Sequence, residues 1–188
     1  MSRSLQTDKR DKGLLNRIAD GSIEAFNLFY EIYYLHLYNY ILRLVKDPFI
    51  SEEILQETFI SVWLGAKKFK NRSLVKTWVF RIAHNKSVSW LRKKRFLLTS
   101  FEDNSEKTYR AEEEKGTEYN AENKIFEDAI YRAVNKLSPK HRAVIELSFK
   151  YGFSYKEIAH IMNCPVGTVK SRMSYAIKYL KQDLNNRN

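Results

Sequence analysis

One stretch of the sequence places polar residues at steps of four, four and three: Arg81, Asn85, Ser89 and Arg92. Residues at such steps share one face of an α-helix. Guanidinium, amide and hydroxyl groups bind the phosphate oxygens and base edges of nucleic acids. Further cations follow, Lys93 among them, and these either contact the same partner or form a solvated helix end stabilised by the helix dipole. The stretch predicts a nucleic-acid-binding helix face.

A second set of such residues lies in the predicted last helix, in which Pro165 takes the first position. Apolar residues at helical spacing, from Val166 to Leu180, would form its buried stripe. The residues left for solvent or a partner are Thr168, Lys170, Ser171, Arg172, Tyr175 and Lys178. Because Lys and Arg side chains reach guanine O6 and N7 in the major groove, this face also predicts DNA contacts.

The residues before this helix complete a helix-turn-helix motif. Ser154 and Glu157 form an S-x-x-E capping box that opens a short helix, and residues 163–165 form a turn. A short capped helix, a tight turn and a longer basic helix are typical of DNA-binding proteins, in which the second helix enters the major groove.

Residues for catalysis are scarce. The sequence has no GxG, GxxxxGK or HExxH motif, and its single cysteine, Cys164, excludes an internal disulfide and any CxxC pair. The four histidines have no metal-ligand spacing. We expect no catalytic residue, no metal and no cofactor. For Cys164, a small apolar plug is a better interpretation than a redox sensor, which would need a lowered thiol pKa.

Charge divides the chain into three parts, with a net charge of +9 in residues 1–99, −5 in residues 100–122 and +7 in residues 123–188. The 44 residues between Glu57 and Glu102 hold 11 Lys or Arg and no acid. Such a field attracts polyanions, and the aromatic residues within it favour nucleic acid over a membrane surface. A solvated lysine-rich surface is the plainer alternative. We expect two basic domains, with the boundaries given, joined by an acidic flexible linker.

The fold class is expected to be all-α, with two small helical domains. Glycines and prolines lie almost entirely at the ends of predicted elements, and β-type alternation is missing. No apolar stretch approaches the roughly 18 residues of a membrane span, and no secretory signal opens the chain. We therefore expect a cytoplasmic protein with no direct membrane insertion.

Capping residues set the expected helix boundaries. In the first domain, Ser22 and Ser51 are the predicted caps of two helices, and a third helix begins at about Trp78. In the second domain, helices are expected over residues 125–137 and from Ser138 with Pro139 to Gly152, before the helix-turn-helix. The tryptophans Trp63, Trp78 and Trp90 could stack on bases, but helical spacing favours core positions.

Both domains resemble one protein family, in the family's order. The second domain is similar to domain 4 of bacterial sigma factors of the sigma-70 family, extracytoplasmic-function (ECF) group, in LSPKHRAVIEL (137–147) and SYKEIAHIMNCPVGTVKSRMSYAIKYL (154–180). The first resembles their domain 2 in DPFISEEILQETFISVWLGAKKF (47–69) and TWVFRIAHNKSVSWLRKKR (77–95). The resemblance implies a promoter-specificity subunit that binds core RNA polymerase, helps open promoter DNA and directs transcription initiation.

This resemblance implies roles for residues of the first domain. In the family, the helix that matches residues 51–64 grips a coiled coil of the polymerase β′ subunit. The residues this puts at the contact are Glu53, Gln56 and Glu57. Asn85 stands where family members line a pocket for a flipped non-template base, and the loop 68–77 would border that pocket. The residues implied to face the start-proximal (minus ten) element are Arg81, Asn85, Ser89, Arg92 and Lys93.

In the second domain, the resemblance assigns the upstream (minus thirty-five) element to the residues left exposed on the last helix. Tyr175 departs from the family, in which a basic residue is frequent there, so the upstream sequence preference stays open. The implied partners are promoter DNA, core RNA polymerase through its β′ and β subunits, and an anti-sigma factor, which in the family is commonly membrane-anchored.

Two other functions compete with this one. A stand-alone helix-turn-helix transcription regulator would bind operators, and its N-terminal domain would show a ligand pocket or an acidic phosphoacceptor cluster. A nucleic-acid enzyme would need an acid to hold a metal or to act as a base, and residues 58–101 contain none. The basic N-terminal domain favours the promoter-specificity subunit.

Overall fold

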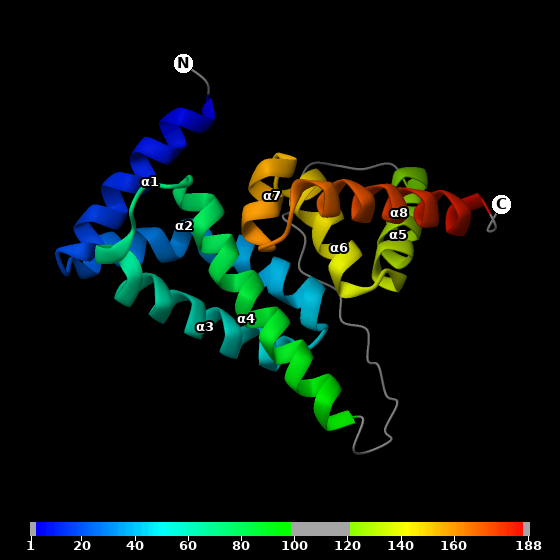
Figure 1. The fold of residues 1–188 in the computed structure, drawn as a ribbon, viewed down its shortest axis with the longest axis horizontal. Coiled ribbons are helices and arrows are strands. Elements are labelled where there is room, and N and C mark those ends of the chain that lie inside the picture. Colours follow the sequence, from blue (N-terminus) through cyan, green and yellow to red (C-terminus); the bar gives the residue numbers. More distant parts are fainter. Residues whose placement is uncertain (1–2, 99–120, 186–188) are drawn as a thin grey trace. The chain divides into compact units, whose positions relative to one another are not determined.

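The structure is a computed structural model of the 188-residue chain. It describes the backbone of residues 3–98 and 121–185, and the side chains of residues 6–96 and 128–185. Within these ranges every regular element is a helix (Figure 1), which confirms the all-α expectation. Most of the predicted acidic linker, residues 100–120, lies outside the described residues.

The described helices belong to two compact units. The first contains α1 (Arg3–Ala19), α2 (Ile23–Val45), α3 (Pro48–Gly65), the short 3-10 helix η1 (Ala66–Lys68) and α4 (Val75–Leu98). The second contains α5 (Ala121–Lys136), α6 (Pro139–Ile145), the π-helical turn η2 (Glu146–Lys150), α7 (Tyr155–Ile161) as far as Ala159, and α8 (Val166–Asn185). The predicted domain boundaries after residues 99 and 122 stay predictions, although α5 begins two residues inside the predicted linker. Among the described helices, none combines the length and the apolar character that crossing a membrane requires.

Helix α2 forms the centre of the first unit and packs against α1, α3 and α4. Its side chains Phe29, Leu37 and Ile41 have no exposed surface. The ring of Tyr40, also on α2, lies 5.4 Å from that of Phe80 on α4. Burying a side chain of this size contributes roughly 1.5 to 3 kcal/mol, so α2 supplies a large share of the stability of this unit.

Local caps set the starts of α2 and α3. Ser22 caps α2 as predicted, because its Oγ accepts a hydrogen bond from the Ala25 N–H at 3.2 Å. The prediction that Ser51 caps α3 is wrong. The cap is Asp47, whose carboxylate accepts from the Ile50 N–H at 3.1 Å, while Pro48 takes the first helical position, where no N–H is needed. Ser51 is buried inside the helix, and its Oγ donates to the Asp47 carbonyl.

Helix α1 was not predicted from the sequence, because two of its inward positions are acids. Leu14, Leu15 and Ile18 are buried, as in an ordinary amphipathic helix. One and two turns earlier, Asp11 and Asp8 are also buried. Asp11 accepts a hydrogen bond from the Tyr33 hydroxyl of α2, and Asp8 accepts one from the backbone at the start of α4. Burial and the Asp11 carboxylate raise the pKa of Tyr33 well above its usual range, so this bond persists at neutral pH.

The second unit confirms the capping box of the helix-turn-helix. The Ser154 N–H donates to Glu157 Oε2 at 2.8 Å, and the Glu157 N–H donates to Ser154 Oγ at 3.4 Å. The starts of two helices, α8 and α6, differ slightly from the prediction. Pro165 precedes α8, since its carbonyl accepts the first helical bonds. Ser138 precedes α6, but its Oγ lies 3.0 Å from His141 Nδ1 and makes no bond to the helix backbone.

A buried arginine joins α5 to α6. Arg142 is only 2% exposed. Its guanidinium donates to the Asn135 carbonyl at 2.6 Å, the Leu137 carbonyl at 2.7 Å and the Val134 carbonyl at 3.3 Å. These carbonyls lie at the end of α5 and just after it, where helical donors run out, although the Val134 carbonyl also accepts from the Leu137 N–H at 3.1 Å. The planar guanidinium serves all three, and a lysine ammonium could not take its place.

We expect Arg142→Met to destabilise the second unit by about 3 kcal/mol, because it leaves buried carbonyls without a donor. All three tryptophans lie in the first unit, so tryptophan fluorescence reports that unit alone and far-UV circular dichroism reports both. In urea, the variant should lose part of its dichroism early and keep the fluorescence midpoint of the native protein. Lys140→Met, an exposed change in the same helix, is the control, and equal midpoints for the two variants would contradict the assignment.

Candidate functional site

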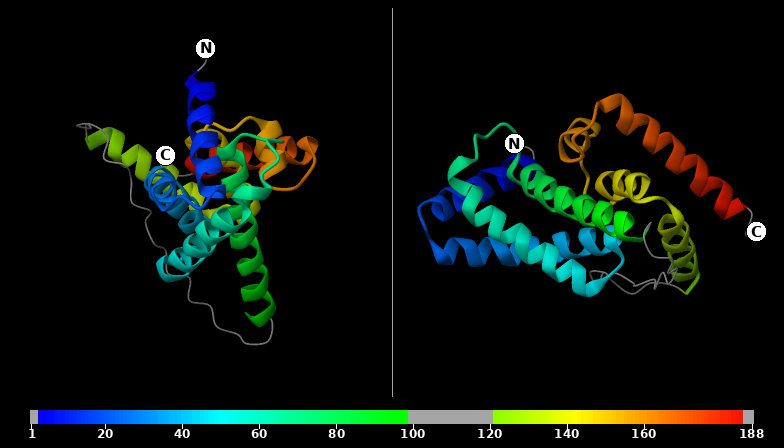
Figure 2. Two further views of the ribbon diagram at one scale, coloured as in Figure 1. Left: turned by 90° about the vertical axis from the view of Figure 1, so that its left-hand side faces the viewer. Right: turned by 60° about the horizontal axis from the view of Figure 1, so that its bottom comes forward.

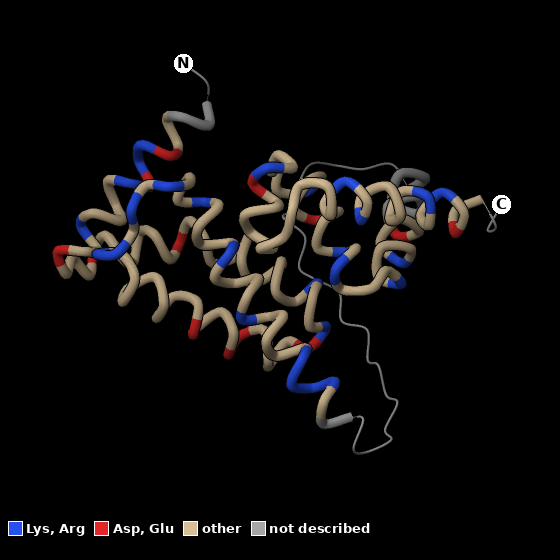
Figure 3. The backbone as a smooth tube through the Cα atoms, in the orientation of Figure 1, with Lys and Arg blue, Asp and Glu red and all other residues tan. Residues whose placement is uncertain are grey.

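The polar face predicted on residues 81–92 is present on α4. Asn85, Ser89 and Arg92 are exposed, as is Lys93, and Arg81 is half-buried. The opposite face of α4 is buried through Val79, Phe80 and Ala83. Figure 3 shows Lys and Arg along α4 toward its C-terminal end. The structure therefore brings the five predicted start-proximal residues together on one helix, and all but Arg81 have exposed side chains.

The tryptophans lie mainly in packed positions. Trp78 contacts Phe69, with ring centres 5.1 Å apart, and a Cβ atom on Gly65 would lie 3.2 Å from its ring. Trp90 is half-buried, and the Lys94 ammonium lies 5.2 Å from the centre of its ring. Trp63 differs from the core expectation. One edge packs against Phe26, but 37% of the residue stays exposed.

The outer face of α3 carries exposed apolar residues beside the predicted polymerase contacts. Glu53, Gln56 and Glu57 are all exposed, as expected. The large apolar residues that share this face by helical spacing, with their exposed fractions, are Phe49 (72%), Ile60 (58%) and Leu64 (69%). We did not predict these three from the sequence, although their helical spacing from Glu53 and Gln56 places them on the same face of the helix. Exposed apolar side chains beside acids are typical of protein-binding surfaces.

An ion pair at the edge of this face joins α3 to α4. Lys86 Nζ lies 3.0 Å from Glu57 Oε2. Because the pair is largely exposed, it contributes at most about 1 kcal/mol to stability. The pair links Glu57 to α4, although 63% of the Glu57 side chain stays exposed.

The outer face of α8 exposes four of its six predicted residues, namely Lys170, Ser171, Tyr175 and Lys178. The other two, Thr168 and Arg172, are half-buried. The Arg172 guanidinium lies 3.8 Å from the sulfur of Cys164, in the turn before the helix. Cys164 itself is a half-buried free thiol.

Tyr175 is fixed by a stacking contact with α6. Its ring centre lies 4.3 Å from that of His141, with 25° between the ring planes. Burial, to which the Tyr175 ring contributes, and the cations Lys140 and Arg172 lower the pKa of His141 below its ordinary value. A tyrosine at this position thus gains an orientation that a flexible basic side chain would not have.

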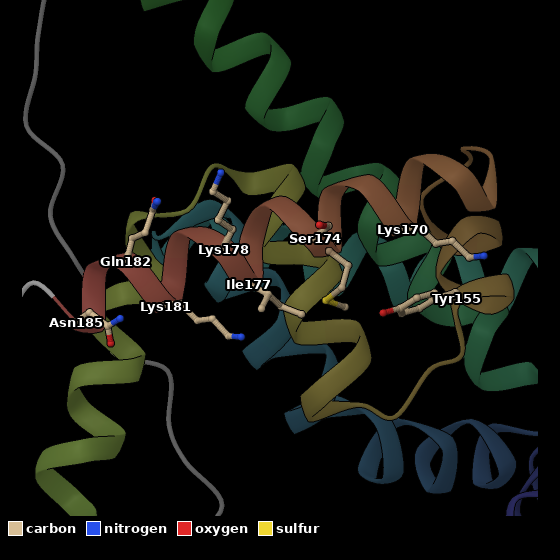
Figure 4. A pocket seen from close by; sticks show the side chains of 9 residues that line it. Tyr155, Lys170, Ser174, Ile177, Lys178, Lys181, Gln182 and Asn185 are labelled. Carbon is tan, nitrogen blue, oxygen red and sulfur yellow. The ribbon is translucent and has the colours of Figure 1, made fainter.

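An open groove of about 590 Å³ runs along one side of α8 (Figure 4). Met173 and Ile177 supply apolar surface, Tyr155 of α7 closes one end, and Lys170 and Lys178 lie along its length. Two of the predicted DNA-binding lysines therefore border both the outer face of α8 and this groove. Among the described residues, no cluster of three or more His, Cys, Asp or Glu side chains could hold a metal ion.

Comparison with known proteins matches both units. The family model described as Sigma-70 region 2 matches residues 29–96, and that described as Sigma-70, region 4 matches residues 127–180. The chain is 29% identical over 165 residues to the ECF RNA polymerase sigma factor SigX of Bacillus subtilis, covering 86% of this chain and 84% of that one. It is 30% identical over 169 residues to the ECF RNA polymerase sigma-E factor of Escherichia coli, covering 87% and 88%.

Solved structures agree with these matches. The sigma factor RpoE from Bartonella quintana, in complex with the anti-sigma factor NepR, superposes with a TM-score of 0.71 at 26% identity, over 87% of this chain and 98% of that one. CnrH, in complex with the cytosolic domain of CnrY, gives a TM-score of 0.68 at 20% identity over 95% and 99%, which supports the fold alone.

We expect Tyr175→Ala to raise the pKa of His141 toward its ordinary value, because the imidazole loses the ring that covers it. Tyr175→Phe keeps the stacked ring and should leave this pKa low. An NMR titration of the His141 ring protons between about pH 5 and 8 compares the three proteins, with His141→Gln to assign the signal. Because the lowered pKa favours neutral His141 in the fold, its contribution to stability should be lost as the pH falls. Identical titration curves for all three proteins would contradict the stacking.

Proposed function

The chain belongs to the sigma-70 family, in its ECF group, and from that membership we propose which of its surfaces bind polymerase and which bind promoter DNA. It is a promoter-specificity subunit: it binds core RNA polymerase, recognises promoter DNA and directs transcription initiation. Sigma factors of this kind are not themselves enzymes. A stand-alone regulator is not favoured, because its N-terminal domain would not match sigma region 2.

The observation that carries our assignment is that each matched region contains one basic helix with an exposed polar face, α4 in region 2 and α8 in region 4. We assign the face of α4 that includes Asn85 to the start-proximal element. An asparagine offers both a donor and an acceptor to the pairing edge of an extruded base. Arg92 and Lys93, near the Lys- and Arg-rich C-terminal end of the same helix, would neutralise phosphates.

The upstream element is assigned to α8, whose N-terminal half would enter the major groove. Lys170 and Arg172 are the residues suited to guanine, and Ser171 can bond to several bases. Tyr175, held against His141, offers a ring and a hydroxyl in a fixed orientation. These assignments rest on side-chain chemistry and on the family positions they occupy.

Polymerase binding is assigned to the outer face of α3. Its exposed apolar side chains gain from burial against a partner helix, and Glu53, Gln56 and Glu57 would select a partner with basic and polar residues. In the family this partner is the coiled coil of the β′ subunit. We also propose that an anti-sigma factor binds this chain, since the Bartonella quintana relative is bound to one.

Charge reversal on α3 tests the polymerase surface. We expect Glu57→Lys to weaken binding to core polymerase by roughly tenfold or more, equivalent to about 1.4 kcal/mol, because it places a cation against a basic partner. Binding is measured with purified core polymerase by fluorescence anisotropy. Glu31→Lys, an exposed reversal on α2, should bind normally.

Glu57→Lys also breaks the ion pair with Lys86, so a second variant must separate this effect on binding from the lost contact with the partner. The double variant Glu57→Lys with Lys86→Glu restores a pair of opposite charges but leaves a cation on the outer face. It should bind core polymerase as weakly as Glu57→Lys alone. Full recovery would show that the pair, and not contact with the partner, explains the loss.

The two DNA surfaces should read separate elements. We expect Arg172→Ala to cost roughly 1 to 3 kcal/mol of binding and to relax base preference at the upstream element only. Asn85→Ala should alter preference at the start-proximal element only. Open-complex formation on single-base promoter variants measures both. Arg92→Ala is the control for phosphate contact, and it should weaken all variants evenly and reduce the salt slope by about one. An even loss for Asn85→Ala would remove its base-reading role.

A further inference from the structure

The start of α4 is capped by a residue 67 positions earlier in the chain. Asp8 Oδ1 accepts a hydrogen bond from the Val75 backbone N–H at 3.0 Å. The other carboxylate oxygen lies 2.8 Å from Lys12 Nζ, one turn further along α1. Asp8 is 7% exposed and Val75 is fully buried, so water does not compete for this bond.

This bond does what a local cap does elsewhere in the fold. The first helical bond of α4 runs from the Trp78 N–H to the Leu74 carbonyl, so the Val75 N–H has no acceptor within the helix. The residue before α2 is Ser22 and the residue before α3 is Asp47, and both cap through their own side chains. The residue before α4 is Leu74, which has no polar side chain. Asp8 supplies the missing acceptor from α1.

A basic loop leads into Val75, the residue to which Asp8 bonds. Residues 69–74 connect η1 to α4, and Lys70 and Arg72 in this loop are exposed. Asn71, between them, adopts a left-handed conformation with φ of 53°. Helix α1 packs against both η1 and α4, on either side of the loop (Figure 2). Asp8 therefore fixes the point at which the loop joins the helix.

We infer that Asp8 is a positioning residue for promoter recognition: by holding the Val75 N–H, it sets where the loop 69–74 lies relative to the Asn85 face of α4. The loop cations and the α4 face belong to the same acid-free run, so DNA bound to α4 meets both. Lys12 neutralises the Asp8 carboxylate, so this acid does not repel phosphates. The inference rests on the proposed start-proximal role of α4.

Variants of Asp8 in the full chain, assembled with core polymerase, test this role. Open-complex formation is measured on promoters with single-base changes at the start-proximal and upstream elements. Asp8→Ala should flatten start-proximal base preferences by about threefold or more and leave upstream preferences unchanged. Asp8→Asn keeps a side-chain oxygen for the Val75 N–H and should restore the native pattern.

Asp11→Ala separates positioning from a general loss of stability. Asp11 is a buried acid on the same helix, but it bonds to Tyr33 of α2 and not to α4. Its removal should lower the unfolding midpoint while leaving the pattern of base preference native. If Asp8→Ala gives the same result as Asp11→Ala, Asp8 is only a stabilising residue and the inference is overturned.

Two further measurements cover the remaining outcomes. If Asp8→Ala does not fold, Asp8→Glu keeps the charge and displaces the carboxylate, and it should alter start-proximal preference and speed hydrogen exchange at the Val75 amide. Native exchange and native preference in Asp8→Glu would overturn the inference. Asn85→Ala, measured in parallel, tests the proposed function itself. If Asn85→Ala changes start-proximal preference and no Asp8 variant does, the inference fails while the proposed function stands.

Discussion

The exposed face of the first unit depends on one packing arrangement, the rotation of α4 about its own axis against α2. This rotation determines which side chains of α4 a partner can contact. Val79, Phe80 and Ala83 have no exposed surface, and the Tyr40 hydroxyl lies 2.8 Å from His84 Nδ1 inside the interface. A buried hydrogen bond of this kind favours the rotation in which it forms, since any other rotation breaks it. The same rotation points Asn85 outward and leaves Lys86 within reach of α3. Packing therefore sets the polar face of α4.

The second unit meets a different constraint, because its described part, residues 121–159 and 163–185, has only 62 residues. A domain of this size buries a modest apolar core. The guanidinium of Arg142 is among the groups buried in this core. The cation ties three carbonyls at the end of α5 to α6, so the two helices keep a fixed angle on which α8 then packs.

The sequence predicted the parts of the fold that depend on neighbouring residues. The Ser22 cap, the capping box at Ser154 and the outward faces of α4 and α8 follow from local spacing, and the structure contains them. It did not predict features that depend on distant residues. Helix α4 begins at Val75, whose N–H bonds to the distant Asp8, whereas the sequence predicted a start at about Trp78. Helix α1 was missed because buried acids interrupt its apolar stripe. The exposed apolar side chains of α3, Ile60 among them, were missed because spacing alone does not say which faces a fold covers.

The long separation between Asp8 and Val75 also affects how the chain leaves the ribosome. At synthesis rates of about 5 to 20 residues per second, roughly 3 to 13 seconds pass between the two residues. During that interval the start of α4 has not yet been made, so the Asp8 carboxylate remains hydrated, as does Asp11 until Tyr33 has been made. An entirely apolar inner face on α1 would expose aggregation-prone hydrophobic surface throughout that interval. The two acids that interrupt the apolar stripe of α1 therefore also reduce the apolar surface that this helix exposes before the contacts that bury them have been made.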